Sequence, residues 1–164
     1  MCQVGAVDPR AAQPAGELDE VVGYVLKRAA AALRTRMDTA LRPLELTVPQ
    51  YACLELLRRR PGLSNAELAR GAFVTRQSMN GVLRGLLNRG LLTRPTTAPH
   101  GRARPTQLTP AGREQLLAAG AAVRAIEEQM LLSLPPARRR QLLDDLATCA
   151  AALNQEFSDQ PAET

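Results

Sequence analysis

The stretch SNAELARGAFVTRQSMNGVLRGLLNRGLLTRPTTAPHGRARPTQLT, residues 64–109, decides the fold. It begins with a short amphipathic segment that stops at Gly71, and a second amphipathic segment follows Thr75 after a brief turn. A basic segment interrupted by prolines and a glycine comes directly after the second one. Two helices joined by a turn and followed by such a segment predict a helix-turn-helix with a β-wing.

Both helices have recognisable start signals. Ser64 is a good N-cap residue, and Glu67 lies three positions later, where its side chain completes a capping box. Thr75 offers a hydroxyl to the first turn of the second helix. That helix has one apolar face at helical spacing, which we expect to be buried; it consists of Met79, Val82, Leu83 and Leu86.

The opposite face of the second helix is polar and indicates contact with DNA. Arg, Gln and Asn have the donor and acceptor patterns that match guanine and adenine edges in a major groove. A solvated surface is the alternative, but such surfaces usually mix charge signs, and no acidic residue lies between Glu67 and Glu114. Gly81 and Gly85 also weaken the helix by about 1 kcal/mol each relative to Ala, which solvation alone does not require. We predict that four side chains lie at base edges or flanking phosphates, namely Arg76, Gln77, Asn80 and Arg84, and that Thr75 and Ser78 hold the helix start and contact phosphate.

Basic charge is concentrated in this part of the chain. Residues 64–113 contain eight Arg and one Glu, a balance of +7, whereas the whole chain has a net charge of +5, so the remainder is −2. An anionic polymer partner requires such a concentration, and general solubility does not.

The basic segment after the second helix predicts a wing. Pro105 confines the returning strand to the edge of a small two- or three-stranded sheet. Arg102 and Arg104 are two residues apart, so an extended strand places them on one side. We expect one or both to enter a minor groove, with Arg102 leading. A hairpin tip that is only solvated is the alternative.

Composition predicts one domain that is mainly α with a small β-wing. The chain has 164 residues and is rich in Leu and Ala, with two Phe, two Tyr and no Trp. No apolar run is long enough to span a bilayer, and the N-terminus lacks the pattern of a signal peptide, so we expect a cytoplasmic protein.

Chemistry-bearing residues are few. The single histidine, His100, and three scattered cysteines predict neither a metal site nor a cofactor. No catalytic motif is present, so we do not expect an enzyme. Cys53 lies among apolar neighbours and is expected to be an inert core residue, whereas Cys149 on the last helix leaves open a thiol-based redox response.

The chain divides into five parts by composition and periodicity. Residues 1–16 are rich in Pro, Gly and Ala and are expected to form a flexible arm, and residues 158–164 a flexible tail. Residues 43–109 form the expected DNA-binding region. Long helices over 17–41, 111–134 and the segment after Pro136 belong to the helical dimerisation regions, 17–42 and 110–157. The last helix has apolar residues at alternating spacings of four and three, with a final four, that nothing in the monomer obviously covers: Leu142, Leu146, Cys149, Leu153 and Phe157.

Two segments of the chain resemble a known family. The segments LTVPQYACLELLRRRPGLSNAELARGAFVTRQSMNGVLRGLLNRGLL and GRARPTQLTPAGRE are similar to the MarR (multiple antibiotic resistance regulator) family of winged-helix transcription factors. The resemblance covers roughly residues 18–157 and implies a homodimer that binds a pseudo-palindromic double-stranded operator, often as a repressor released by a small molecule or an oxidant. The family's wing commonly has an Asp two positions before its Arg; here His100 precedes Arg102.

The resemblance also implies a pocket for an aromatic acid between the first long helix, the next helix and the wing domain. Tyr24 and Arg28 share a face of the first helix, and with Tyr51 they are the candidate ligand residues. In the alternative, Tyr24 closes the core and Arg28 pairs with Glu20 or Asp19.

Two other functions remain open alongside a ligand-released repressor. One is a thiol-based redox-responsive regulator. The other is a non-catalytic winged-helix module that binds protein or RNA, or DNA without sequence preference. RNA readers usually display stacking aromatics, and we expect the one aromatic residue near the proposed surface, Phe73, to lie in the core of the turn.

Overall fold

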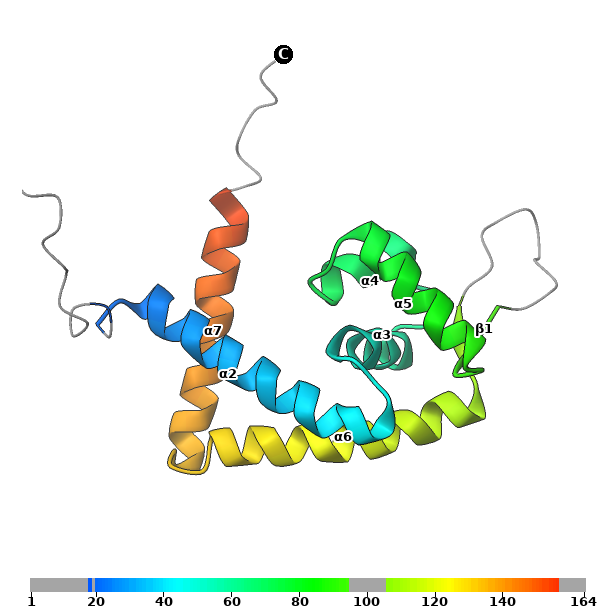
Figure 1. Ribbon diagram of the computed structural model, residues 1–164. Helices are drawn as coiled ribbons and strands as arrows, with labels where there is room; N and C mark the ends of the chain where they lie inside the picture. The colour runs from blue at the N-terminus through cyan, green and yellow to red at the C-terminus, as the bar shows by residue number, and fades with distance from the viewer. Residues whose placement is uncertain (1–17, 19, 95–105, 157–164) are drawn as a thin grey trace, which may run out of the picture.

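A computed structural model describes residues 18, 20–94 and 106–156 (Figure 1). The predicted arm and tail, Arg102 and Arg104 lie outside the described residues. The elements in chain order are helix α2 (Val22–Leu41), a 3-10 turn (Arg42–Leu44), helices α3 (Val48–Arg59), α4 (Asn65–Gly71) and α5 (Arg76–Asn88), strands β1 (Leu92–Thr93) and β2 (Gln107–Leu108), and helices α6 (Pro110–Met130) and α7 (Pro136–Glu156). The structure is therefore mainly α with a small sheet, as predicted.

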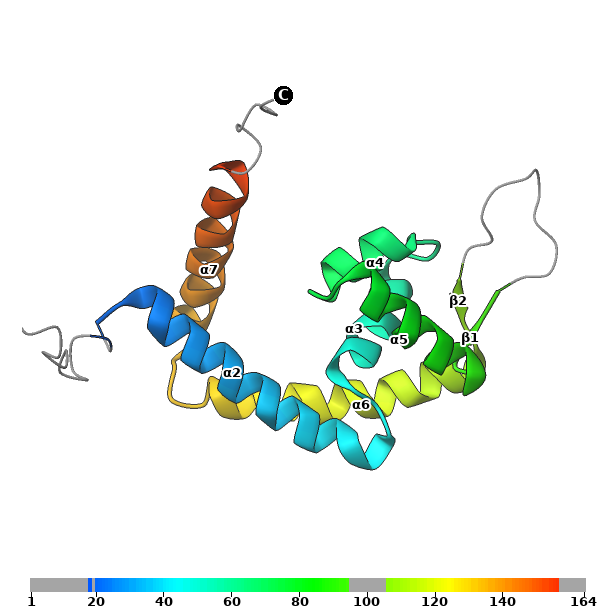
Figure 2. The same cartoon turned by 45° about the horizontal axis from the view of Figure 1, so that its top comes forward.

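Helix α6 connects the cluster of short helices to the rest of the described structure. Helices α3, α4 and α5 and the two strands gather at the N-terminal end of α6, α2 lies along α6, and α7 rises from its C-terminal end away from α3–α5 (Figures 1 and 2). The strands pair antiparallel, with Leu92 opposite Leu108. None of the described helices combines the length and the apolar character that a bilayer crossing requires.

Local caps explain where the helices begin. The side chains of Thr47, Ser64, Thr75 and Thr109 each accept a hydrogen bond from the backbone N–H three residues later, at the starts of α3, α4, α5 and α6. The capping box predicted at Ser64 is present, and α3 has a second one. Each such cap stabilises its helix by about 1 kcal/mol, so the start of each of these helices is specified by local residues.

The end of α6 differs from the prediction. The expected helix over 111–134 ends at Met130, and the chain then turns, with the N–H of Leu134 bonded to the carbonyl of Leu131. Pro135 and Pro136 follow, and the residue before a proline disfavours the α conformation. At this turn the chain changes direction, and α7 rises away from the axis of α6 (Figures 1 and 2).

The core fixes α5 against its neighbours. Met79, Leu83 and Leu86 of α5 are at most 4% exposed, as the apolar face of that helix predicts. They pack in one cluster with residues of α3, α4 and α6, including Leu54, Leu57, Leu68, Leu116 and Ala119. The polar face of α5 is consequently held outward.

The prediction for Phe73 was wrong. Its side chain is 94% exposed, and its backbone is left-handed with φ 55°. The turn between α4 and α5 requires that conformation, and the partly buried Ala72 and Val74 fill the apolar space on either side. Left-handed backbone is uncommon for a bulky residue, so local propensity gave no sign of this arrangement.

Candidate nucleic-acid interface and ligand pocket

The exposed face of α5 is the candidate DNA-reading surface. Arg76, Gln77, Asn80 and Arg84 are all exposed on it, so the structure brings the four predicted base-reading side chains together. Each has N–H donors, and no carboxylate lies on the helix. The face therefore matches the acceptor-rich edges and phosphates of a duplex.

The N-terminus of α5 is capped by Thr75 and has chemistry that favours an anion. The Thr75 Oγ1 accepts a hydrogen bond from the Ser78 N–H at 3.1 Å and donates one to the Ser78 Oγ at 2.9 Å. The first turn of the helix has no acidic residue. Its partial positive charge is therefore not offset by its own side chains, which favours an anion there.

A shallow hollow of about 280 Å³ lies between α5 and the base of the wing. Arg94, just after β1, faces the helix across it. Four of its lining side chains are hydrogen-bond donors, and two leucines form the floor; the lining consists of Asn80, Leu83, Arg84, Leu87, Asn88 and Arg94. This hollow extends the cationic surface from the recognition helix toward the wing.

One side-chain contact ties this face to the preceding helix. The Nδ2 of Asn65, the first residue of α4, donates a short hydrogen bond to the Oδ1 of Asn80. Asn80 is thus oriented by a residue outside the recognition helix.

The two glycines of α5 have different surroundings. A Cβ at Gly85 would lie 3.3 Å from the Gln50 Nε2 of α3, so a larger residue there would require that side chain to shift slightly. A Cβ at Gly81 would meet nothing within 4 Å. Nothing in the described part of the chain therefore requires a glycine at 81, although it weakens the helix. Close approach of a partner to the exposed backbone provides a reason.

A second hollow, of about 640 Å³, lies between α3 and α6. Tyr51 is on its wall, with apolar residues of α6 including Leu116 and Val123. Four arginines and two glutamates also line it, giving a balance of +2; they are Arg58, Arg59, Arg113, Arg124, Glu55 and Glu127. An apolar wall beside excess positive charge suits a small aromatic anion.

The charges of this hollow are partly paired. Glu55 accepts hydrogen bonds from Arg58 at 2.7 and 3.0 Å and from Arg59 at 2.7 Å. The hydrogen bond from Arg58 is the main reason that the pKa of Glu55 is lowered to about 2. Burial, and then the negative charge of Glu55, raise the pKa of Tyr51, so its phenol is a neutral donor at neutral pH.

Tyr24 and Arg28 lie elsewhere. The Arg28 guanidinium carbon sits 5.8 Å from the centre of the Tyr24 ring, and neither residue lines the hollow that contains Tyr51. Within one chain the structure therefore does not bring the three predicted ligand residues together.

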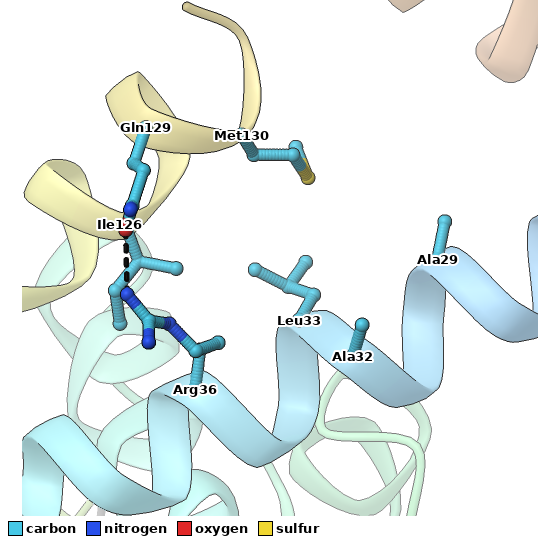
Figure 3. A pocket seen from close by; sticks show the side chains of 7 residues that line it. All are labelled: Ala29, Ala32, Leu33, Arg36, Ile126, Gln129 and Met130. Atoms are coloured by element: carbon cyan, nitrogen blue, oxygen red, sulfur yellow. Dashed lines mark hydrogen bonds between the residues drawn. The ribbon is translucent and has the colours of Figure 1, made fainter.

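A third hollow, of about 310 Å³, separates α2 from the C-terminal part of α6 (Figure 3). Leu33 of α2 faces Ile126 and Met130 of α6 across it. The Arg36 Nη2 donates a hydrogen bond to the Gln129 Oε1 at 2.6 Å, which closes one side. Its lining is mostly apolar, and we expect protein side chains rather than a polar ligand to fill it.

Comparison with known proteins identifies the family. Residues 44–103 match the model of the MarR family. The HTH-type transcriptional repressor Rv2887 of Mycobacterium tuberculosis is 45% identical over 123 residues, which are 75% of this chain and 88% of that protein. This chain belongs to the MarR family.

Solved structures of relatives agree with this assignment. The M. tuberculosis MarR family protein Rv2887 in complex with salicylic acid has a TM-score of 0.69 and 43% identity, over 80% of this chain and 97% of that one. Rv2887 in complex with DNA has a TM-score of 0.67 and 41% identity, over 80% and 98%. The transcriptional repressor CouR bound to a 23-mer DNA duplex has a TM-score of 0.73 and 33% identity, over 82% and 96%. The fold is a winged helix, and this MarR-family protein is a DNA-binding transcriptional regulator.

The two described cysteines of this MarR-family protein differ in exposure. Cys53 is fully buried, and burial raises the pKa of its thiol to about 12. It therefore has almost no thiolate at neutral pH and is a core residue, as expected. Cys149 is exposed on α7. The described residues contain no group of three or more His, Cys, Asp or Glu that would hold a metal ion.

Several site residues were not singled out from the sequence. Asn65 follows a strong cap in the first turn of α4, and no spacing in the sequence indicates its contact with Asn80 in the second turn of α5. In the sequence Arg94 is one basic residue of the segment after α5, and nothing there indicates that it lies beside that helix. The face of α3 that lines the larger hollow was detectable, because Tyr51, Glu55 and Arg58 follow one another at spacings of four and three.

Replacing Gly81 by Ala separates stability from DNA binding. We predict that Gly81→Ala raises the free energy of unfolding by about 1 kcal/mol, because Ala favours an exposed helix interior and the added Cβ meets open space. We predict that the same change weakens DNA binding several-fold, because the methyl group keeps the helix from the duplex. Thermal unfolding and fluorescence anisotropy with labelled DNA measure the two effects.

Gly23 provides a matched control. It too is exposed in a helix, and a Cβ there meets nothing within 4 Å, but it lies on α2, outside the proposed DNA-reading surface. Because α2 belongs to the surface proposed below for the dimer, light scattering first checks that Gly23→Ala is a dimer, and its DNA affinity is then expected to stay within about twofold of the original. Equal DNA affinities for Gly81→Ala and the unaltered protein would contradict the proposed close approach.

Proposed function

We propose that this protein is a homodimeric repressor that recognises a pseudo-palindromic operator through α5 and is released by a small aromatic carboxylate. The exposed, acid-free face of α5 is the main support for this proposal, because its side chains and its N-terminus are all donors directed outward. Arg76, Gln77, Asn80 and Arg84 contact base edges or flanking phosphates, and Thr75 and Ser78 contact phosphate. Arg102, with Arg104, enters the adjacent minor groove; both remain sequence-based predictions.

A dimer is required because one recognition helix covers only a half-site. Two related by a twofold axis reach successive major grooves about 34 Å apart. The apolar surface for such a dimer exists at both ends of the chain. Val22 of α2 is 76% exposed, and Leu143 and Leu153 of α7 are 69% and 62% exposed in the single chain. We propose that α2, α6 and α7 bury this surface against the second copy.

The hollow between α3 and α6 is the proposed effector site. Its apolar wall suits an aromatic ring, its arginines suit a carboxylate, and the Tyr51 hydroxyl suits a polar substituent. The relative Rv2887 has been crystallised with salicylic acid and with p-aminosalicylic acid, which supports an aromatic carboxylate. Tyr24 and Arg28 would join such a site only if the dimer brings α2 of the second copy to it.

Release follows from differential binding. A ligand between α3 and α6 favours the geometry in which that space is open, and it lowers DNA affinity if that geometry spaces the two recognition helices wrongly for the operator. We also propose a regulatory, non-catalytic role and a cytoplasmic location, since the DNA of a bacterial-type repressor is in the cytoplasm. The described residues supply no observation that favours a thiol switch over this mechanism.

The DNA contact is tested by removing one reading side chain. Arg84→Ala is expected to weaken binding to the selected operator about tenfold or more and to relax preference at one base pair, since a specific base contact is worth about 1–3 kcal/mol. Arg140→Ala removes an exposed Arg of α7, away from α5. Because α7 belongs to the proposed dimer surface, light scattering first checks that the variant is a dimer, and its affinity is then expected to change less than twofold. Fluorescence anisotropy at fixed salt gives both affinities. Equal effects of the two substitutions would refute the assignment of α5.

The effector site is tested with salicylate as the probe. Salicylate is expected to raise the Kd for operator DNA, and Arg124→Ala is expected to reduce that response while leaving the Kd without salicylate nearly unchanged. Arg140→Ala again serves as the control for loss of one Arg. An unaltered salicylate response in Arg124→Ala, or its equal loss in both variants, would place the site elsewhere.

A further inference from the structure

Asn65 makes a side-chain contact that orients the Asn80 amide. Its Nδ2 donates to the Asn80 Oδ1 across fifteen residues of sequence, from the first turn of α4 to the exposed face of α5. The oxygen of the Asn80 amide therefore points back toward α4. The amide nitrogen, with its two N–H donors, is left for whatever binds the face.

The burial of one atom of Asn65, its Oδ1, supports this orientation of the two amides. The Asn65 Oδ1 is buried and has no hydrogen-bond partner among the described residues. Exchanging the oxygen and nitrogen of both amides would keep the bond between them but would bury the NH2 group of Asn65 at that place instead. An unpaired buried N–H is rarer in proteins than an under-satisfied carbonyl. The arrangement with Asn65 as the donor is thus the better one.

The contact is not needed to hold α4 and α5 together. Leu68 of α4 and Met79 and Leu83 of α5 are buried in one cluster and already fix the crossing of the two helices. A neutral hydrogen bond between side chains that are partly exposed adds about 1 kcal/mol. Its distinctive effect is to engage the oxygen of the Asn80 amide, so that the NH2 group faces outward.

We propose that Asn65 is a positioning residue that sets the base preference of Asn80, by making it a donor toward the major groove. This inference rests on the proposed DNA contact of α5. A donor matches guanine, whose major-groove edge has two acceptors, and mismatches cytosine, whose edge presents an amino donor. A free Asn amide turns to suit either edge, whereas one held by Asn65 does not.

Asn65→Asp is the decisive variant. A carboxylate only accepts, so it bonds the Asn80 Nδ2 and turns the Asn80 Oδ1 toward the groove. An acid in the first turn of a helix is favourable, which offsets part of the cost of placing a carboxylate oxygen at the buried Oδ1 position, and thermal unfolding checks that the variant is folded. Asn65→Leu, of similar size, removes the bond without replacing it.

The measurement is the ratio of Kd values on two duplexes. They differ only by a G·C or C·G pair at the position where Asn80→Ala loses base preference. The ratio cancels the general loss of affinity that an added negative charge causes. We expect a guanine preference of about fivefold or more in the unaltered protein, a reversed preference in Asn65→Asp, and a preference within about twofold of unity in Asn65→Leu.

Asn88→Asp is the matched control. It makes the same substitution at a residue that lines the hollow beside Asn80, without contact to Asn65, and is expected to lower affinity for both duplexes alike. If Asn80→Ala changes preference but Asn65→Asp keeps that of the unaltered protein, the positioning role is overturned while the DNA contact of Asn80 stands. If Asn80→Ala changes preference at no position, the base contact proposed for Asn80 is itself refuted, and this inference with it.

Discussion

The absence of a side chain at residue 112 is the constraint on which the arrangement of the molecule depends. A Cβ at Gly112 would lie 2.0 Å from the carbonyl oxygen of Leu91, so only glycine fits. The same carbonyl accepts the N–H of Thr109 at 3.1 Å, and the Thr109 hydroxyl donates to the Gly90 carbonyl at 2.7 Å. The start of α6 thus contacts the chain directly after α5, where β1 and the wing begin.

This junction makes α6 the mechanical link between the parts of the protein. The helix lines the hollow beside α3, packs along α2, and ends at the turn into α7. A change in spacing between α3 and α6, or between two copies of α6 in a dimer, therefore moves the segment that follows α5. Because packed elements shift between discrete arrangements rather than deform continuously, an effector bound beside α3 has a direct route to the recognition helix.

The sequence predicted what depends on local interactions and missed what depends on tertiary contacts. The caps at Ser64 and Thr75 and the two faces of α5 follow from residue types at fixed spacings, so they were predictable. The exposure of Phe73, the bond between Asn65 and Asn80 and the close approach at Gly112 arise from how helices meet, and no periodicity reports that. DNA contact by Thr75, Arg76, Gln77, Ser78, Asn80, Arg84, Arg102 and Arg104 stays a prediction, as does ligand contact by Tyr24, Arg28 and Tyr51.

The central claim is that two copies of α5 read a symmetric site. The test is to select bound duplexes from genomic fragments with the full-length protein at near-physiological salt. The best site is then footprinted. We expect a twofold-symmetric site with half-sites about 10 base pairs apart, protected on one face of the duplex. Binding without sequence preference, or protection of a single asymmetric half-site, would contradict it.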